Sequence, residues 1–161
     1  MSSSPNRASN PTGKPRRKDV TVDLTTARQM LPLVRSIVAD IVESRKHLTR
    51  YAPEQELLDE NRRALDWSGR RRRYALHDEL VQVEKNLTTA VSELDSLGLL
   101  LVDPDAGTVE FPTKINGRPA AFSWQLGEDG VAHWRYTGEQ QRRPIPADWQ
   151  QGAPLRARGD L

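Results

Sequence analysis

Three residues in the C-terminal half of the sequence, Glu110, Glu128 and His133, have side chains that suit acid–base chemistry or metal binding. Glu110 and His133 lie in segments that we expect to be strands, and cross-strand placement would bring them to one face of a sheet. The histidines of the chain, however, lack a metal-ligand spacing such as H-E-x-x-H. The structural alternatives are a histidine on the polar face of a strand and a Glu128 carboxylate that stabilises a turn. We therefore expect no catalytic residue, no metal and no cofactor. An enzyme or metal site near His133 is kept as the last of three functional hypotheses.

Four consecutive arginines form the second candidate site, for anions: Arg70, Arg71, Arg72 and Arg73. Such a run could contact successive phosphates of a nucleic acid or another polyanion, and the basic N-terminal tail would add nonspecific attraction. Consecutive residues of a helix point in different directions, so no single face presents all four guanidinium groups. No aromatic residue is interleaved with the run, which argues against a stacking platform for single strands. A solvated helix start, with Asp66 paired to Arg70, is the structural alternative.

The composition limits the classes of protein to which these residues can belong. Because the 161 residues include no cysteine, disulfide scaffolds, zinc knuckles, iron–sulfur sites and thiol catalysis are excluded. No apolar run approaches the roughly 20 residues of a membrane span, and the N-terminus lacks the apolar core of a signal peptide. The formal net charge is only +2, with positive charge mainly in the N-terminal tail and the arginine run. We therefore expect a cytoplasmic protein without a membrane partner.

Polar ends flank the region that should fold. Residues 1–19 are predicted to be a disordered basic tail, because they cannot bury enough apolar surface to offset the entropy of ordering. Residues 138–161, rich in Pro, Gly and Gln, are predicted to be a mostly irregular tail. Between them we expect one domain, made of a helical hairpin over residues 20–98 and an antiparallel sheet over residues 99–137 that packs on the helices.

The first arm of the hairpin has capping and breaking signals. Thr26–Gln29 matches a capping box, which predicts a helix over residues 27–50. Tyr51–Pro53 should end that helix, and residues 54–67 should form a shorter one. Ser68–Gly69 is predicted to be a turn.

The second arm has the clearest periodicity in the chain. A helix over residues 70–97 carries a coiled-coil-like seam with alternating steps of four and three: Leu76, Leu80, Val83, Leu87, Ala90, Leu94 and Leu97. Gly98 follows as a helix-terminating glycine would. The two arms nearly match in length, which favours an antiparallel pair. The seam needs cover from the other helix, the sheet or a second protomer.

Beyond Gly98 the period changes to two, which predicts short strands. We expect them over residues 99–102, 108–111, 120–126 and 131–136, with a hairpin turn at Asn116–Gly117. Phe122, Trp124 and Trp134 would form an aromatic face against the helices. The predicted fold class is α+β: a long antiparallel helical hairpin followed by a small antiparallel β-meander.

Short motifs in this half resemble a known family. Gly107–Pro112, Ser123–Glu128, His133–Arg135 and Arg143–Ile145 occur in the order of the family's G-x-V-[DE]-F-P, C-W-x-L-G-E, W-H and R-x-P-[LI] motifs, and Leu31–Arg35 matches its L-P-x-[LV]-R opening. The chain thus resembles the bacterial family called domain of unknown function 2203. The motif positions, of unknown role, include Glu110, Phe111, Pro112, Trp124, Leu126, Gly127, Glu128 and Trp134.

The sequence departs from the family pattern at two places. Ser123 stands where the family has Cys, and Arg135 stands where it has His, with His133 placed before the tryptophan instead. If those two residues formed a site in the family, this chain would lack it. The resemblance implies the fold and a bacterial source, and it implies no activity.

Three functional hypotheses follow from the sequence. The first is a non-enzymatic interaction or assembly protein, a homodimer through the helical seam. The second is binding of nucleic acid or another polyanion through Arg70–Arg73 and the basic tail. The third is the enzyme or metal site near His133.

Overall fold

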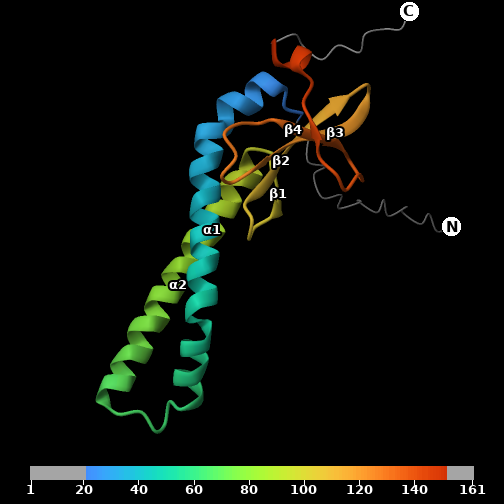
Figure 1. The fold of residues 1–161 in the computed structure, drawn as a ribbon. Helices are drawn as coiled ribbons and strands as arrows, with labels where there is room; N and C mark the ends of the chain where they lie inside the picture. Colours follow the sequence, from blue (N-terminus) through green and yellow to red (C-terminus); the bar gives the residue numbers. More distant parts are fainter. Residues whose placement is uncertain (1–20, 152–161) are drawn as a thin grey trace, which may run out of the picture.

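The structure is a computed structural model that describes residues 21–151. Helices α1 (Leu24–Glu60) and α2 (Trp67–Ser96) form an antiparallel hairpin, and a five-stranded antiparallel sheet follows them (Figure 1). The strands lie in the order of the sequence and are β1 (Leu100–Asp103), β2 (Thr108–Ile115), β3 (Arg118–Gln125), β4 (His133–Tyr136) and β5 (Arg143–Pro144). The predicted α+β class is confirmed. The predicted disordered tail, residues 1–19, lies outside the described residues.

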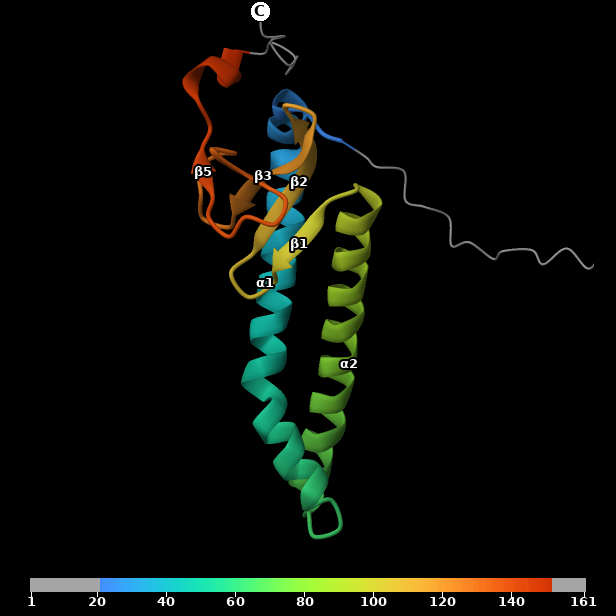
Figure 2. The same cartoon turned by 90° about the vertical axis from the view of Figure 1, so that its right-hand side faces the viewer.

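The sheet lies beside one end of the helical hairpin, and the other end projects away from it as a free arm. Figures 1 and 2 show the sheet against the start of α1 and the end of α2, with the α1–α2 turn at the far end. With 30 residues, α2 is about 45 Å long at 1.5 Å per residue. Neither described helix has an apolar stretch long enough to cross a membrane.

Helix α1 begins earlier and ends later than the sequence pattern predicts. The residue that caps it is Asp23, whose Oδ1 accepts a hydrogen bond of 2.7 Å from Thr26 N, so the predicted start at Thr26 is wrong. The predicted break at Tyr51–Pro53 is also wrong, because the helix continues through Pro53 to Glu60. The helix predicted over residues 54–67 is therefore the last part of α1 together with the turn.

Contacts with α2 favour the continuation of the helix through Pro53. An interior proline costs about 3 kcal/mol, because it removes one hydrogen bond and crowds the preceding turn. On either side of Pro53, Tyr51 and Glu54 meet the same α2 residue. The Arg72 guanidinium lies 5.9 Å from the Tyr51 ring and donates hydrogen bonds of 2.6 and 2.9 Å to the Glu54 carboxylate. These contacts with α2 offset part of the cost of the proline.

The start of α2 also differs from the prediction. Gly69 N donates a hydrogen bond of 2.7 Å to Asp66 Oδ1, so Asp66 is the N-cap and the helix begins at Trp67. Ser68 and Gly69, predicted to form a turn, lie in the first turn of the helix. Asp66 is used in capping, and the predicted Asp66–Arg70 ion pair is not among the ion pairs of the described residues.

The predicted seam of α2 packs against α1. Leu76, Leu80, Ala90 and Leu94 are buried, and the remaining seam residues, Val83, Leu87 and Leu97, are half-buried. The cover comes from the neighbouring helix of the same chain, so folding of the hairpin does not require a second protomer. A homodimer through the helices stays a prediction.

Strand β2 is longer than predicted because Pro112 fits within it. Pro112 lies opposite Ala121 of β3, and its carbonyl accepts a hydrogen bond of 2.7 Å from Val22 N on the other side of the strand. The N and C=O of one strand residue point the same way, so the missing N–H of Pro112 removes no bond to β3. The predicted hairpin at Asn116–Gly117 is confirmed, and both residues have positive φ, 53° and 74°.

The segment after β4, predicted to be mostly irregular, contributes β5 and the 3₁₀ helix η1 (Ala147–Gln151). Ile145 is buried, and the Trp149 ring lies 5.1 Å from the Trp134 ring. This segment covers the end of the aromatic side of the sheet.

Gly107, in the turn before β2, lies close against α1. Its φ is +75°, and a Cβ there would lie 2.8 Å from Leu126 Cβ and 2.9 Å from Val38 Cγ1. Only a residue without a side chain meets both requirements. Gly107 therefore fixes how closely the turn before β2 packs on the first helix.

We predict that Gly107→Ala lowers the free energy of unfolding by about 2–4 kcal/mol, the sum of the left-handed backbone cost and of overpacking. Gly117→Ala is the matched control, because Gly117 has a similar φ of +74° but a Cβ at that position would meet nothing within 4 Å. The control should cost only the backbone part, about 1–2 kcal/mol. Urea unfolding followed by circular dichroism measures both, and equal losses would contradict the packing role of Gly107.

Candidate functional site

The aromatic motif residues belong to the core and not to a binding surface. Phe111, Trp124 and Trp134 are 0%, 0% and 7% exposed and form part of one apolar cluster with residues of α1 and α2. Pro112 is a half-buried residue of β2. Phe111, Trp124 and Trp134, whose role the sequence left open, hold the sheet on the helices.

The opposite face of the sheet carries a cluster of charged side chains, which we call the polar cluster: Glu110, Ser123, Glu128, His133, Arg135 and Arg142. Its most buried ion pair joins Glu110 of β2 to Arg135 of β4, with Nε–Oε2 and Nη2–Oε1 distances of 2.5 and 2.8 Å. The Glu110 side chain is only 6% exposed. The hydrogen bonds to Glu110 outweigh desolvation and raise the pKa of Arg135. Arg135 also donates to the carbonyl of Glu139.

Leu126, Gly127 and Glu128 form the turn after β3, and Glu128 closes it. Gln125 N donates a hydrogen bond of 2.7 Å to Glu128 Oε1, and Glu128 N donates one of 3.0 Å to the Gln125 carbonyl. Trp124 Nε1 donates to the Glu128 carbonyl at 3.1 Å. Gly127 has a φ of +99°, which suits its place in the turn. The predicted role of Glu128 as a turn-stabilising carboxylate agrees with these contacts.

The Glu128 carboxylate also lies beside two side chains from other segments. Arg142 Nη1, from the segment before β5, donates a hydrogen bond of 2.8 Å to Oε1, and His133 Nδ1 lies 3.2 Å from Oε2. Desolvation of the half-buried carboxyl acts to raise its pKa, but the hydrogen bonds from Arg142 and Gln125 N outweigh it, so the pKa of Glu128 is lowered. Glu128 is therefore an ionised anchor for the C-terminal segment.

Glu110 and His133 lie on one face of the sheet and Glu128 lies in the turn after β3, and the three residues do not form one site. Ser123 lies between them in register, opposite Glu110 on one side and His133 on the other. Glu110 binds Arg135, whereas His133 faces Glu128. Within residues 21–151, no group of three or more His, Asp or Glu side chains could hold a metal ion. The arrangement pairs carboxylates with cations, which is chemistry that holds strands together.

The arginines of the polar cluster were not predicted as site residues. Arg135 appeared only as a departure from the family pattern, and Arg142 was not identified. The sequence could have placed Arg135 on the same face as His133, because side chains two residues apart in a strand point to the same side. The position of Arg142 could not be found this way, because its partner Glu128 lies in a separate turn.

Two of the four consecutive arginines form ion pairs with carboxylates of α1. Arg72 binds Glu54, as described above, and Arg73 Nε lies 2.8 Å from Asp59 Oδ1. The hydrogen bonds between the partners raise the pKa of Arg72 and lower the pKa of Glu54. Arg72 and Arg73 therefore join α1 to α2 and are not free for a ligand.

The other two arginines lie on an exposed surface at the free end of the hairpin. We call residues 61–75, the α1–α2 turn and the first part of α2, the arm end. Arg70 and Arg71 are exposed and form no ion pair with any described residue. The sequence run is thus split into a structural pair and an exposed pair.

Two aromatic residues that the sequence reasoning missed flank the exposed pair. Trp67 is 69% exposed and Tyr74 is 65% exposed, and they lie seven residues apart on α2. Seven residues make nearly two helical turns, so both rings lie on the side of α2 that also carries Arg70 and Arg71. No aromatic residue is interleaved with the run in the sequence, but on the surface of α2 both rings lie beside the exposed arginines. The seven-residue spacing of Trp67 and Tyr74 was the signal that could have found them.

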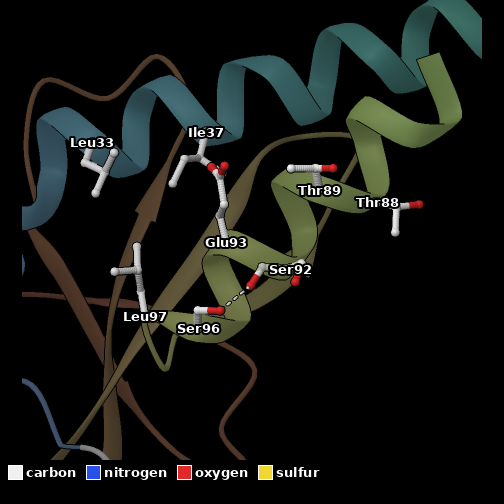
Figure 3. Close-up of a pocket in the computed structure, with 8 residues that line it drawn as sticks. All are labelled: Leu33, Ile37, Thr88, Thr89, Ser92, Glu93, Ser96 and Leu97. Carbon is white, nitrogen blue, oxygen red and sulfur yellow. Dashed lines mark hydrogen bonds between the residues drawn. The ribbon is translucent and has the colours of Figure 1, made fainter. Parts of the chain in front are cut away.

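A groove between α1 and α2 lies near the other end of the hairpin. It has a volume of about 610 Å³ and is lined by eight residues: Leu33, Ile37, Thr88, Thr89, Ser92, Glu93, Ser96 and Leu97. Figure 3 shows Leu33 and Ile37 of α1 facing the α2 side, where Ser96 Oγ donates to the Ser92 carbonyl. Leu33 is 54% exposed. This is an open apolar surface with one charged residue, Glu93.

Comparison with known proteins identifies the family. The model of a family described as Uncharacterized conserved protein (DUF2203) matches residues 21–145. The chain belongs to the DUF2203 family. No curated protein and no solved structure gives a match.

In this DUF2203 protein, the motif residues are explained by the fold. Gly107 allows the sheet to approach α1, Trp124 and Trp134 fill the core, and Glu110 and Glu128 hold the ion pairs. The two departures from the family pattern lie within the polar cluster. Ser123 is 1% exposed and lies 3.4 Å from Arg142 Nη1, while Arg135 is the partner of Glu110.

We predict that the stabilisation provided by Glu128 disappears in acid. Its pKa is lowered from 4.5 in the folded state, so the carboxylate stabilises the fold above pH 4.5 and this effect is lost as the pH falls through the lowered pKa. Glu128→Gln should reduce the free energy of unfolding by about 1–3 kcal/mol at neutral pH, and the difference from wild type should shrink in acid.

Urea unfolding at several pH values measures this difference. Asp129→Asn is the control, because exposed Asp129 is the next residue and its side chain forms no ion pair among the described residues. A Glu128→Gln effect that stays constant down to pH 3 would contradict the ion-pair role.

Proposed function

We propose that this DUF2203 protein binds nucleic acid or a related polyanion through the arm end. The observation that carries this proposal is the exposed pair Arg70–Arg71, which lacks a carboxylate partner among the described residues and lies between two exposed aromatic rings. Guanidinium groups form paired hydrogen bonds with phosphates and carry a permanent charge, so an uncompensated pair on an exposed helix face suits a phosphate backbone.

The neighbouring turn adds to the same charge. Arg62 and Arg63 are exposed and also form no ion pair with a described residue. Two acidic residues of this region are engaged, since Asp59 binds Arg73 and Asp66 caps α2, whereas exposed Glu60 forms no ion pair among the described residues. Together with Arg70 and Arg71, the arm end carries four exposed arginines that form no ion pair with a described residue.

The shape of the molecule supports the same function. The arm extends away from the sheet, so its end can approach a large partner without interference from the rest of the described chain (Figures 1 and 2). The polar cluster, in contrast, has its carboxylates neutralised by its own cations. The arm end is therefore the favoured contact surface for a polyanion.

We predict that the full chain binds short RNA or DNA oligonucleotides at low salt and that binding weakens as salt rises. Fluorescence anisotropy with labelled oligonucleotides at several salt concentrations gives the slope of log affinity against log salt. Arg70→Gln/Arg71→Gln should make this slope shallower by about 1.4, because each phosphate contact to a single strand contributes about 0.7.

The matched control is Lys46→Gln/Lys85→Gln. It removes the same charge from two helix residues outside the arm end. Its slope should stay close to that of wild type. Absence of binding at the lowest salt, or equal effects of the two double variants, would overturn the proposal.

A second candidate function is self-association through the helices, and the α1–α2 groove favours it. The predicted seam is covered within the chain, so an assembly role needs another surface. The groove supplies one, because Leu33 projects at its rim with 54% exposure and the α2 side carries small hydroxyl residues that leave room for an inserted side chain. In a two-fold dimer, Leu33 of each copy could enter the groove of the other.

For this candidate we predict a dimer mass in size-exclusion chromatography with light scattering at high micromolar concentration. Leu33→Arg should convert the dimer to a monomer, whereas Leu57→Arg, at a comparably exposed leucine of the arm, should not. A helical wild-type protein that stays monomeric would end this candidate.

A further inference from the structure

Trp67 and Tyr74 contribute little to the folding of the hairpin. They are 69% and 65% exposed, and neither belongs to the apolar core. A large aromatic ring left in water forgoes the stabilisation that burial would give, so the fold itself does not account for them. Two such rings on one face of a projecting arm indicate a surface that is used in binding.

The rings and the arginines alternate along the helix. Arg70 and Arg71 follow Trp67 by three and four residues, and Tyr74 follows them by four and three. These are the spacings at which helix side chains are neighbours. The rings are separated by about 10.5 Å along the axis, at 1.5 Å per residue. The face therefore presents ring, two guanidinium groups and ring in sequence.

This alternation fits an unpaired nucleic-acid strand better than a duplex. A single strand offers the flat faces of its bases for stacking and its phosphates for ion pairing, and proteins that bind it without sequence preference combine these two contacts. In a duplex the base faces are stacked on each other, so the exposed rings would gain nothing beyond the phosphate contacts. The two aromatic rings thus decide between these ligands.

Other partners fit the surface less well. A second copy of the chain packed on the same face in parallel would bring its own Arg70 and Arg71 against these cations, and like charges at close range are unfavourable. A protein partner would need to supply carboxylates between two aromatic contacts, whereas a single strand has a negative charge at every nucleotide.

We propose that the arm end binds single-stranded nucleic acid, with unpaired bases stacked on Trp67 and Tyr74 and the backbone held by Arg70 and Arg71. This inference rests on the proposed function of the same surface and specifies its ligand. The stacking is tolerant of base identity, because every base has an aromatic face. Arg62 and Arg63 of the adjacent turn extend the positive charge toward the strand.

The test compares a single-stranded oligonucleotide with the duplex of the same sequence, using the full chain. We expect the single strand to bind at least about tenfold more tightly. Trp67→Ala and Tyr74→Ala should each weaken single-strand binding about five- to 150-fold, with the salt slope unchanged, because they remove stacking and not charge. Trp67→Phe should retain much of the affinity.

Two readouts separate stacking from a general effect of mutation. Leu57→Ala, which truncates another exposed apolar side chain of the arm, should leave the affinity unchanged. Binding should also quench tryptophan fluorescence in wild type more than in Trp67→Phe, since the difference reports the ring of Trp67 itself. Circular dichroism checks that the variants keep their helices.

The outcomes distinguish this inference from the proposed function. Equal affinity for single strand and duplex, with loss of binding only in Arg70→Gln/Arg71→Gln, would overturn the single-strand inference and leave polyanion binding standing. No binding to either nucleic acid at low salt would overturn both. Binding to anionic lipid vesicles without binding to oligonucleotides would overturn both as well, because the rings and arginines would then face a membrane surface.

Discussion

The packing of α1 on two sides is the constraint on which both halves of this DUF2203 protein depend. One side of α1 covers the leucine-rich seam of α2, and the other side receives the sheet at Gly107, where Val38 and Val42 leave no room for a side chain. A helix buried on two sides cannot shift along one neighbour without disturbing the other. The sheet thereby fixes the direction in which the arm points, although it contacts only one end of it.

Ion pairs on the charged face of the sheet hold the strands and the C-terminal segment together. A buried carboxylate is tolerated only when hydrogen bonds and a cation compensate its lost hydration, and Glu110 obtains both from Arg135. Glu128 connects three separate pieces of chain, namely its own turn, β4 and the segment before β5. Family motifs made of carboxylates and tryptophans can thus reflect the requirements of a small sheet rather than those of a reaction.

The sequence predicted the elements that depend on local pattern and missed those that depend on distant contacts. The seam from Leu76 to Leu97 and the turn at Asn116–Gly117 were found because their periodicity and backbone preferences are encoded in neighbouring residues. The continuation of α1 through Pro53 was missed, because it depends on Arg72, which is far away in sequence. The same limit applies to β5 and to the Glu128–Arg142 pair.

For the candidate sites, the sequence indicated which residues are involved more successfully than it indicated the contacts that each of them makes. The arginine run was identified, but its division between α1 contacts and open surface depends on where α2 begins, and that is set by the Asp66 cap. A helix start displaced by three residues changes which side chains share a face. Trp67, taken as the end of one helix, is instead the first residue of the next and is placed beside Arg70 and Arg71.

Pro53 weakens the backbone hydrogen bonding of α1 within the arm. A proline cannot donate a hydrogen bond to the carbonyl four residues before it, so α1 lacks one backbone hydrogen bond at this level. Bending of the arm should concentrate there, because the other interior proline of α1, Pro32, lies between the core residues Leu31 and Val34. Arg72 of α2 contacts Tyr51 and Glu54, one on each side of Pro53, and so supports α1 at this point. The direction of the outer part of the arm therefore depends on α2 as well as on the hydrogen bonds of α1 itself.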